Sequence, residues 1–289
     1  MTVQDRGQQP DLPGDTYAVF GNPIKHSKSP QIHKAFAQQL GDALTYRAVR
    51  VESDAFESTV LGFFQRGGRG LNITVPFKER ACALADTVSS AAEQAGAANC
   101  LVPREAGLHA ENTDGLGLVK DMAANLGWQL QGRRALVIGA GGAVRGILQP
   151  LLQERVAELI IVNRTASRAL ELAQRFDNPS TAVRGCAPAD VDGETFDLVI
   201  NGTSASLSDD LPELPDIKLS ARCCCYDLVY AAAPTAFMQW SAARAAWAVA
   251  DGLGMLVEQA AESYYLWRGQ RPATDGVISD LRAALLASA

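Results

Sequence analysis

The chain has 289 residues, of which 47% are hydrophobic and 20% charged, a composition typical of globular and not of disordered proteins. Its 26 basic and 32 acidic side chains give a net charge of −6, so we expect no nucleic-acid or membrane partner. No apolar run reaches the roughly 18–20 residues that span a bilayer. Residues 1–16 lack the order of a signal peptide, so we interpret them as a flexible tail and expect a cytoplasmic protein.

Six cysteines need an interpretation because three of them, Cys223 to Cys225, are consecutive. Adjacent strand residues point to opposite faces, so these three cannot complete one tetrahedral metal shell. The chain has no Cys-x-x-Cys pair and only three histidines, of which His33 lies mid-helix and is interpreted as structural. We therefore expect no metal site, and we interpret the strand cysteines as small buried hydrophobic residues.

The first part of the chain alternates strand and helix patterns. Strands are expected over residues 17–23, 45–52 and 70–75, and helices over 29–41, 54–68 and 78–86. In the first helix, Ser29 is expected at the N-cap with Pro30 at the first helical position. The alternation predicts a parallel sheet flanked by helices, and we assign it to a first domain, residues 17–114.

A second strand–helix unit occupies residues 115–250. A helix is expected over 115–127, a strand, glycine turn and helix over 133–152, a helix over 166–176, and strands over 158–165, 196–202 and 223–230. This repeat predicts a doubly wound, Rossmann-like nucleotide-binding domain. Two helices, at 252–269 and 276–288, end the chain. We expect residues 251–289 to return to the first domain, which leaves a cleft between two α/β lobes.

A glycine-rich turn follows the first strand of the second unit and opens a helix. It reads Gly139, Ala140, Gly141, Gly142 and Ala143. Glycines let backbone N–H groups approach a diphosphate, whose charge the helix N-terminus favours. The pattern G-x-G-x-x-G is incomplete, because its last position is Val144. Since any tight strand-to-helix turn can use glycines, the turn favours cofactor binding without proving it.

The end of the next strand indicates which dinucleotide binds. NAD-binding domains usually place an acidic residue there, about 20 residues after the glycines, to hold the ribose 2′-hydroxyl. This chain has Asn163, Arg164 and Thr165 at that position, with Arg168 one helical turn further on. Arginines suit a 2′-phosphate, so we expect NADP(H). The alternative is a helix start capped by Thr165, with two solvated arginines.

Polar residues also gather where elements of the first domain end. The stretch LNITVPFKE places Asn72, Thr74 and Lys78 around a strand that Pro76 stops. A half-exposed strand with a solvated lysine would look the same, and we expect Asn72 to tie the strand end to neighbouring backbone. Comparable stretches are GNPIKHSKSP with Ser27 and Ser29, GAANCLV with Asn99, and ENTDG with Asn112 and Asp114. Asp114 alone could be a turn former.

Taken in order, these stretches, the glycine turn and the late stretch DGLGMLVEQA resemble the shikimate dehydrogenase family. The resemblance extends from about residue 17 to the last helix. It implies a two-lobed α/β enzyme that reversibly reduces 3-dehydroshikimate to shikimate with NADPH, in aromatic amino-acid biosynthesis. In the implied reaction, Lys78 is the acid/base that exchanges a proton with the reacting oxygen, and Asp114 orients it.

Further roles follow from the resemblance, residue by residue. The implied substrate contacts are Ser27 and Ser29 for the carboxylate, Asn99 and Asp114 for the ring hydroxyls, and Thr74, Tyr230 and Gln259 elsewhere. The expected cofactor contacts are Gly139, Ala140, Gly141, Gly142, Ala143, Asn163, Arg164, Thr165 and Arg168, with Leu228 and Gly252 at the nicotinamide end. The chain departs from the family at Lys28, often leucine, at Val144, often small or hydroxylic, and in AAAPTAF, which lacks the proline usual after the threonine.

Three alternatives stay open. A quinate/shikimate dehydrogenase that uses NAD would share the fold, but it would favour an acid after the second strand. A non-catalytic shikimate-binding regulator would be expected to lose Lys78 or Asp114, and both are present. A glutamyl-tRNA reductase-like enzyme would share the glycine turn and Asn-Arg-Thr, without HSKSP or NITVPFK. We expect small-molecule ligands only, and a monomer or homodimer.

Overall fold

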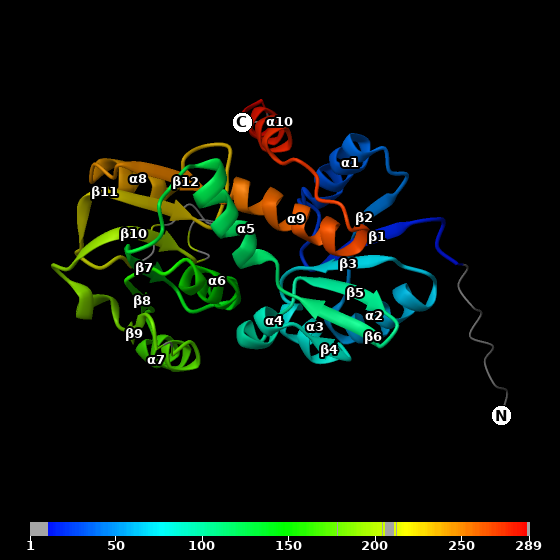
Figure 1. The fold of residues 1–289 in the computed structure, drawn as a ribbon, viewed down its shortest axis with the longest axis horizontal. Helices are drawn as coiled ribbons and strands as arrows, with labels where there is room; N and C mark the ends of the chain where they lie inside the picture. The colour runs from blue at the N-terminus through cyan, green and yellow to red at the C-terminus, as the bar shows by residue number, and fades with distance from the viewer. Residues whose placement is uncertain (1–10, 178, 204, 206–210, 212, 288–289) are drawn as a thin grey trace.

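The structure, a computed structural model, describes residues 11–177, 179–203, 205, 211 and 213–287. The chain folds into two α/β lobes, with α5 (Asp114–Lys120) and α9 (Leu253–Arg268) between them (Figure 1). The two-lobed architecture expected from the sequence is therefore confirmed.

The first lobe is built on a six-stranded sheet in the order β2-β1-β3-β5-β6-β4. Its strands are β1 (Thr16–Gly21), β2 (Thr45–Arg50), β3 (Gly70–Ile73), β4 (Thr87–Val88), β5 (Cys100–Arg104) and β6 (Gly107–Glu111). Its helices are α1 (Ser29–Leu40), α2 (Phe56–Gln65), α3 (Lys78–Leu84) and α4 (Ser90–Ala95), with a 3₁₀ turn at Ser53–Ala55. The last three strands were not expected from the sequence.

This sheet is mixed, so the prediction of a parallel sheet is wrong for two of its five strand pairings. β1 pairs in parallel with β2 and β3, whereas β5 pairs antiparallel with both β3 and β6. The reason is the two-residue turn between β5 and β6, since parallel neighbours need a crossover of a dozen or more residues.

The expected loose tail, residues 1–16, ends earlier in the chain than predicted. Residues 1–10 lie outside the described residues, but Thr16 is buried in β1. The N–H group of Leu12 donates to the carbonyl of Arg66, and Asp15 forms ion pairs with Arg69 and Arg268. Residues 12–16 are therefore part of the first lobe.

The second lobe has a wholly parallel sheet in the order β9-β8-β7-β10-β11-β12. Its strands are β7 (Arg134–Ile138), β8 (Glu158–Val162), β9 (Ala182–Cys186), β10 (Thr195–Asn201), β11 (Lys218–Asp227) and β12 (Ala248–Asp251). Its helices are α6 (Gly142–Gln153), α7 (Ala166–Arg175) and α8 (Ala236–Ala243), and a 3₁₀ turn spans Pro188–Val191. Numbered within the lobe the order is 3-2-1-4-5-6, the Rossmann order, so the doubly wound prediction is confirmed.

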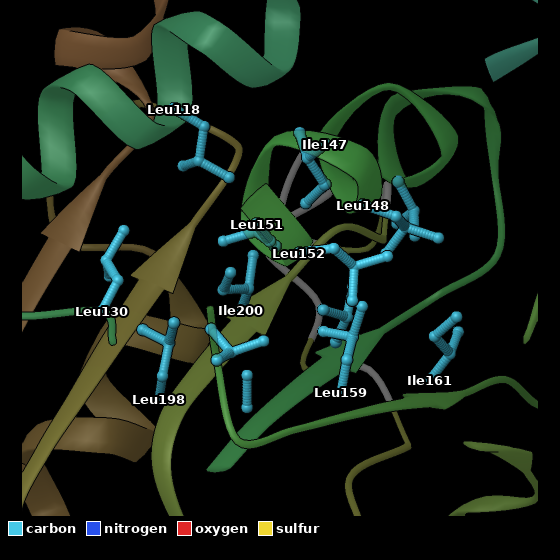
Figure 2. Close-up of a cluster of buried hydrophobic side chains, with 14 of the residues drawn as sticks. Leu118, Leu130, Ile147, Leu148, Leu151, Leu152, Leu159, Ile161, Leu198 and Ile200 are labelled. Atoms are coloured by element: carbon cyan, nitrogen blue, oxygen red, sulfur yellow. The ribbon is translucent and has the colours of Figure 1, made fainter. Parts of the chain in front are cut away.

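Both faces of this sheet are covered, which explains its nearly continuous apolar strands. Ala135 and Val137 of β7 belong to the cluster under α6, while Leu136 and Ile138 belong to the cluster on the opposite face. Figure 2 shows the first cluster, in which Ile147, Leu148, Leu151 and Leu152 of α6 lie over Leu159, Ile161, Leu198 and Ile200 of the strands. Burial of each such side chain contributes about 1.5–3 kcal/mol, and it fixes the glycine turn at the start of α6.

The C-terminal helices pack on the first lobe, as expected from the sequence. On α9, Val257, Ala261 and Tyr264 share a buried cluster with Ile32 and Phe36 of α1. The last helix, α10 (Asp275–Leu286), packs against α9. Because α9 also packs along α5, it borders both lobes (Figure 1).

The consecutive cysteines lie in the buried half of β11, so their interpretation as small core residues is confirmed. Cys223, Cys224 and Cys225 are each at most 2% exposed. All six cysteines are free thiols. Among the described residues no group of three or more His, Cys, Asp or Glu side chains could hold a metal ion. In the same part of the chain, no helix is long and apolar enough to span a bilayer.

Candidate active site

A cavity of ≈ 420 Å³ is lined by residues of both lobes. It contains every substrate contact that the sequence suggested, together with the two residues expected at the nicotinamide end: Ser27, Ser29, Thr74, Lys78, Asn99, Asp114, Leu228, Tyr230, Gly252 and Gln259. These residues come from the ends of β3, β11 and β12, from the position just before β5, from the starts of α1, α3 and α5, and from α9. Residues up to 232 positions apart in the sequence (Ser27 and Gln259) therefore meet in one place.

Lys78 and Asp114 form a close ion pair in this cavity. Lys78 is the first residue of α3, just beyond the turn that follows β3, and its Nζ lies 2.6 Å from Oδ2 of Asp114. The lysine side chain is 21% exposed and the aspartate side chain 9%, so the pair is largely shielded from solvent. The other carboxylate oxygen, Oδ1, accepts a hydrogen bond of 2.8 Å from the Asn99 amide. The carboxylate is thus held on both oxygens, and it fixes the position of the lysine ammonium.

Asn99 is the centre of a buried hydrogen-bond network. Its Oδ1 accepts from the backbone N–H of Thr113 at 2.8 Å, and its Nδ2 also donates to Gln259 Oε1 at 3.1 Å. Asn72 Nδ2 donates to the Asn99 carbonyl at 3.1 Å, which confirms that Asn72 ties the strand end to neighbouring backbone. These contacts leave Asn99, Asp114 and Gln259 in fixed orientations on one wall of the cavity.

A further layer behind Asn72 was missed by the sequence reasoning. The hydroxyl of Tyr46 donates to Asn72 Oδ1 at 2.7 Å, and Asn72 Nδ2 also donates to Ser263 Oγ at 2.9 Å. Tyr46 is on β2 and Ser263 is on α9, far from the motifs in the chain. Thr113, whose backbone N–H donates to Asn99, could have been predicted as part of the site, because it lies inside the ENTDG stretch.

The opposite end of the cavity carries hydroxyls and cations. Ser27 and Ser29 lie at the start of α1, and the backbone N–H of Ser29 donates to Ser27 Oγ at 3.3 Å. The expectation that Ser29 is the N-cap is wrong, because Lys28 holds that position and α1 starts at Ser29. A helix start and nearby cations favour an anion; Lys25 and Lys28 also line the cavity and were not selected from the sequence.

A second cavity, of ≈ 580 Å³, lies at the C-terminal ends of β7, β8 and β10. It is lined by all the residues expected to hold the cofactor other than Leu228 and Gly252: Gly139, Ala140, Gly141, Gly142, Ala143, Asn163, Arg164, Thr165 and Arg168. In the 3-2-1-4 order, β7 and β10 flank the switch point at which such sheets bind nucleotides. The position of the cavity therefore suits a dinucleotide.

The first residue of the glycine turn, Gly139, must be glycine for two physical reasons. Gly139 has a φ of +108°, which residues with a side chain rarely adopt, and a Cβ there would lie 3.3 Å from the backbone of Gly202. A Cβ at Gly202 would in turn lie 2.3 Å from a methyl of Val144. Val144, a departure from the usual motif, is therefore accommodated because Gly202 has no side chain. The backbone N–H groups at the start of α6 remain accessible from the cavity.

Two exposed arginines border the other end of the second cavity. Arg164 and Arg168 form no ion pair with any carboxylate of the described residues. Thr165 does occupy the N-cap of α7, yet its side chain makes no capping hydrogen bond; instead Asn163 Nδ2 donates to the Thr165 carbonyl at 2.9 Å. Glu213 lines the same cavity, from the loop before β11 and not from the end of β8. The strand end itself is cationic.

A Rossmann lobe that faces a lysine–carboxylate pair on a second lobe defines a nicotinamide-dependent oxidoreductase. The models of three protein families match the chain: Shikimate dehydrogenase substrate binding domain over residues 19–101, Shikimate / quinate 5-dehydrogenase over 121–208, and Shikimate 5'-dehydrogenase C-terminal domain over 252–281. The chain belongs to the shikimate dehydrogenase family, as its motifs predicted.

Individual relatives agree with this assignment. The shikimate dehydrogenase (NADP(+)) of Cellvibrio japonicus is 53% identical over 94% of this chain and 98% of its own length. The shikimate dehydrogenase (NADP(+)) of Alkalilimnicola ehrlichii is 52% identical over 93% of this chain and 98% of its own length. Among solved structures, an Ael1 enzyme from Pseudomonas putida is 45% identical, with a TM-score of 0.84 over 93% of this chain and 98% of its own. A Thermus thermophilus shikimate 5-dehydrogenase in complex with NADP(H) and shikimate is 32% identical. Its TM-score is 0.81, over 94% of this chain and 100% of its own.

Proposed function

We propose that this chain catalyses the reversible reduction of 3-dehydroshikimate to shikimate with NADPH, a step of aromatic amino-acid biosynthesis. The observation that carries the proposal is the Lys78–Asp114 pair, which lies in one cavity with two serines and with residues of the Rossmann lobe. Relatives with about half of their residues identical bear the name shikimate dehydrogenase (NADP(+)).

The second lobe fits NADP(H). The bare backbone at Gly139 and the open start of α6 leave room for a diphosphate, and Arg164 and Arg168 offer free charge to a 2′-phosphate. When bound, NADPH supplies the hydride for the ketone. Leu228 and Gly252 would border the nicotinamide, and a Cβ at Gly252 would lie 2.2 Å from the Leu228 carbonyl oxygen, so only glycine fits there.

In this proposal Lys78 moves the proton. Reduction of a ketone leaves negative charge on its oxygen, and the lysine ammonium protonates that oxygen as the charge develops. In the oxidation direction the neutral amine takes the hydroxyl proton. Asp114 positions Nζ through its Oδ2 and would accept a hydrogen bond from a ring hydroxyl. The pair thus acts as one acid/base unit.

The remaining polar residues would orient the substrate. Asn99 and Gln259 face the cavity from the fixed network and would hold ring hydroxyls, while Ser27 and Ser29 would bind the carboxylate at the start of α1. Burial raises the pKa of Tyr230, so its hydroxyl stays protonated and available as a donor. Thr74 lines the same cavity and would add a further contact.

One spectrophotometric experiment tests the proposal. Purified protein is assayed for reduced nicotinamide with shikimate or quinate as the substrate, and with NADP⁺ or NAD⁺ as the cofactor. Shikimate with NADP⁺ should give the highest kcat/KM. The highest value for quinate with NAD⁺ would favour the quinate/shikimate dehydrogenase alternative, and no turnover in any combination would favour a regulator.

We also propose the division into residues 17–114 for substrate, 115–250 for cofactor and 251–289 for the returning helices. The protein would act in the cytoplasm as a monomer or homodimer with small-molecule ligands. The arrangement of α5 and α9 between the lobes supports this division. Light scattering on the purified protein measures the oligomeric state.

A further inference from the structure

An ion pair joins the two lobes directly beside the reacting groups. Arg145, in the first turns of α6, contacts the carboxylate of Glu79 through Nη2. Glu79 immediately follows Lys78 on α3. The arginine side chain is 23% exposed and that of Glu79 64%, so the arginine is the covered partner. A second contact between the lobes lies nearby, where Arg175 Nη2 donates to the Glu93 carbonyl at 2.6 Å.

The Arg145 guanidinium lies beside the glycine turn. A methyl group added at Gly142 would be 3.9 Å from Arg145 Nη2. A third cavity, of ≈ 460 Å³, is lined by Ala140, Gly141, Gly142, Arg145, Arg168 and Arg175, and by two acidic residues, Glu79 and Glu171. This cavity shares the glycine turn and Arg168 with the cofactor cavity. A diphosphate bound at the glycine turn would therefore lie next to the Arg145 guanidinium.

Arg145 has hydrogen-bonding capacity that the protein does not use. Its Nε is buried and has no partner among the described residues, an arrangement that is costly unless a ligand provides an acceptor. Burial, and secondly the charge of Arg175, lower the pKa of the guanidinium. A guanidinium has five donors, so it can keep Glu79 and still hold an anion. Charge and unused donors together suit a diphosphate.

We infer that Arg145 binds the cofactor diphosphate and that Glu79 holds the guanidinium in place for it. This inference rests on the proposed NADP(H)-dependent reaction and adds a cofactor contact to it. It also links cofactor binding to the lobe that carries Lys78, because the arginine is paired with the residue next to that lysine. Arg145 would serve both dinucleotides equally, since NAD(H) and NADP(H) share the diphosphate and differ only in the 2′-phosphate.

Direct binding separates this role from that of the 2′-phosphate site. NADPH and NADH are titrated against the full-length protein, with the fluorescence of the reduced nicotinamide as the signal. In Arg145→Met, the affinity for both should fall by a common factor of about 10 to 100, the loss of a charge-assisted contact. In the matched control Arg168→Met, only the affinity for NADPH should fall. Calorimetric binding of shikimate alone and the melting temperature report whether each variant is folded.

Two results would overturn the inference. They are an Arg145→Met variant that binds both cofactors within about threefold of the unmodified protein, and a loss of affinity in that variant that is confined to NADPH. If the unmodified protein binds neither cofactor, the proposed function fails instead.

Discussion

Protonation of His33 is expected to weaken the fold in acid. The imidazole is fully buried on α1, its ring centroid 4.1 Å from that of Tyr46, and neither ring nitrogen is in hydrogen-bond geometry with a neighbour. Burial lowers its pKa to about 3, while Asn72 acts more weakly in the opposite direction. The folded protein therefore keeps His33 neutral at pH values where the unfolded chain, with a pKa of about 6.5, binds a proton.

The sign and size of the effect follow from this difference. Because the unfolded state binds more protons, the free energy of unfolding falls as the pH falls from about 6.5 to about 3. Each pH unit in that window costs about 1.4 kcal/mol, so His33 alone should make the protein about 2 kcal/mol less stable at pH 5 than at pH 8. Below about pH 3 both states carry the proton, and the contribution of His33 stops growing.

Urea unfolding at about pH 8, 6 and 5, followed by tryptophan fluorescence, measures this contribution. His33→Phe is the matched variant, because it keeps an aromatic ring against Tyr46 and removes the titration. The pH-dependent loss of stability should be about 2 kcal/mol smaller in the variant. A constant loss from an imperfect fit does not alter this comparison. Equal losses in the two proteins would refute the reasoning, and His33 would then have a solvated or protonated state in the fold.

Three further outcomes are expected. Ser27→Ala combined with Ser29→Ala should raise KM for shikimate by about 10-fold or more, and an unchanged KM would place the carboxylate elsewhere. Replacing Arg164 and Arg168 by methionine should raise KM for NADP⁺ by about 100-fold and barely change that for NAD⁺; equal effects on both cofactors would contradict a 2′-phosphate site. Small-angle scattering should show a more compact protein with NADP⁺ and shikimate present, and an identical profile would argue against a large closure of the lobes.

The sequence predicted the parts of the fold that local patterns determine. The apolar strands of the Rossmann lobe and the glycine turn have strong local signals, because burial on both faces produces continuous runs such as Leu159–Val162. β12 was missed, since Ala248–Asp251 is short and lies at the sheet edge. The antiparallel β5–β6 hairpin was missed as well, because its turn lacks the glycine and asparagine pairs that usually reveal one.

In the candidate site, too, the sequence predicted what local patterns determine and missed what only the tertiary fold determines. Each element end with a polar residue was visible in the sequence, and the family resemblance supplied the reason to group them. The contact of Tyr46 with Asn72 and the pairing of Arg145 with Glu79 were not visible, because each joins residues that only the tertiary fold brings together. Neither Tyr46 nor Arg145 differs in its local pattern from an ordinary strand tyrosine or helix arginine. Their surroundings, and not their sequence positions, distinguish them.

A single-turnover measurement on Lys78→Met tests the central claim most directly, that a lysine held by Asp114 exchanges the proton with the reacting oxygen. Enzyme in excess is mixed rapidly with shikimate and NADP⁺, and the absorbance of the reduced nicotinamide is followed. Binding of shikimate and NADPH to the variant is measured separately, and both affinities should stay within about threefold of the unmodified protein. The rate of reduction should fall by about 10²–10⁴-fold. A variant that binds both ligands and keeps more than about a tenth of the rate would contradict the assignment of Lys78 as the acid/base.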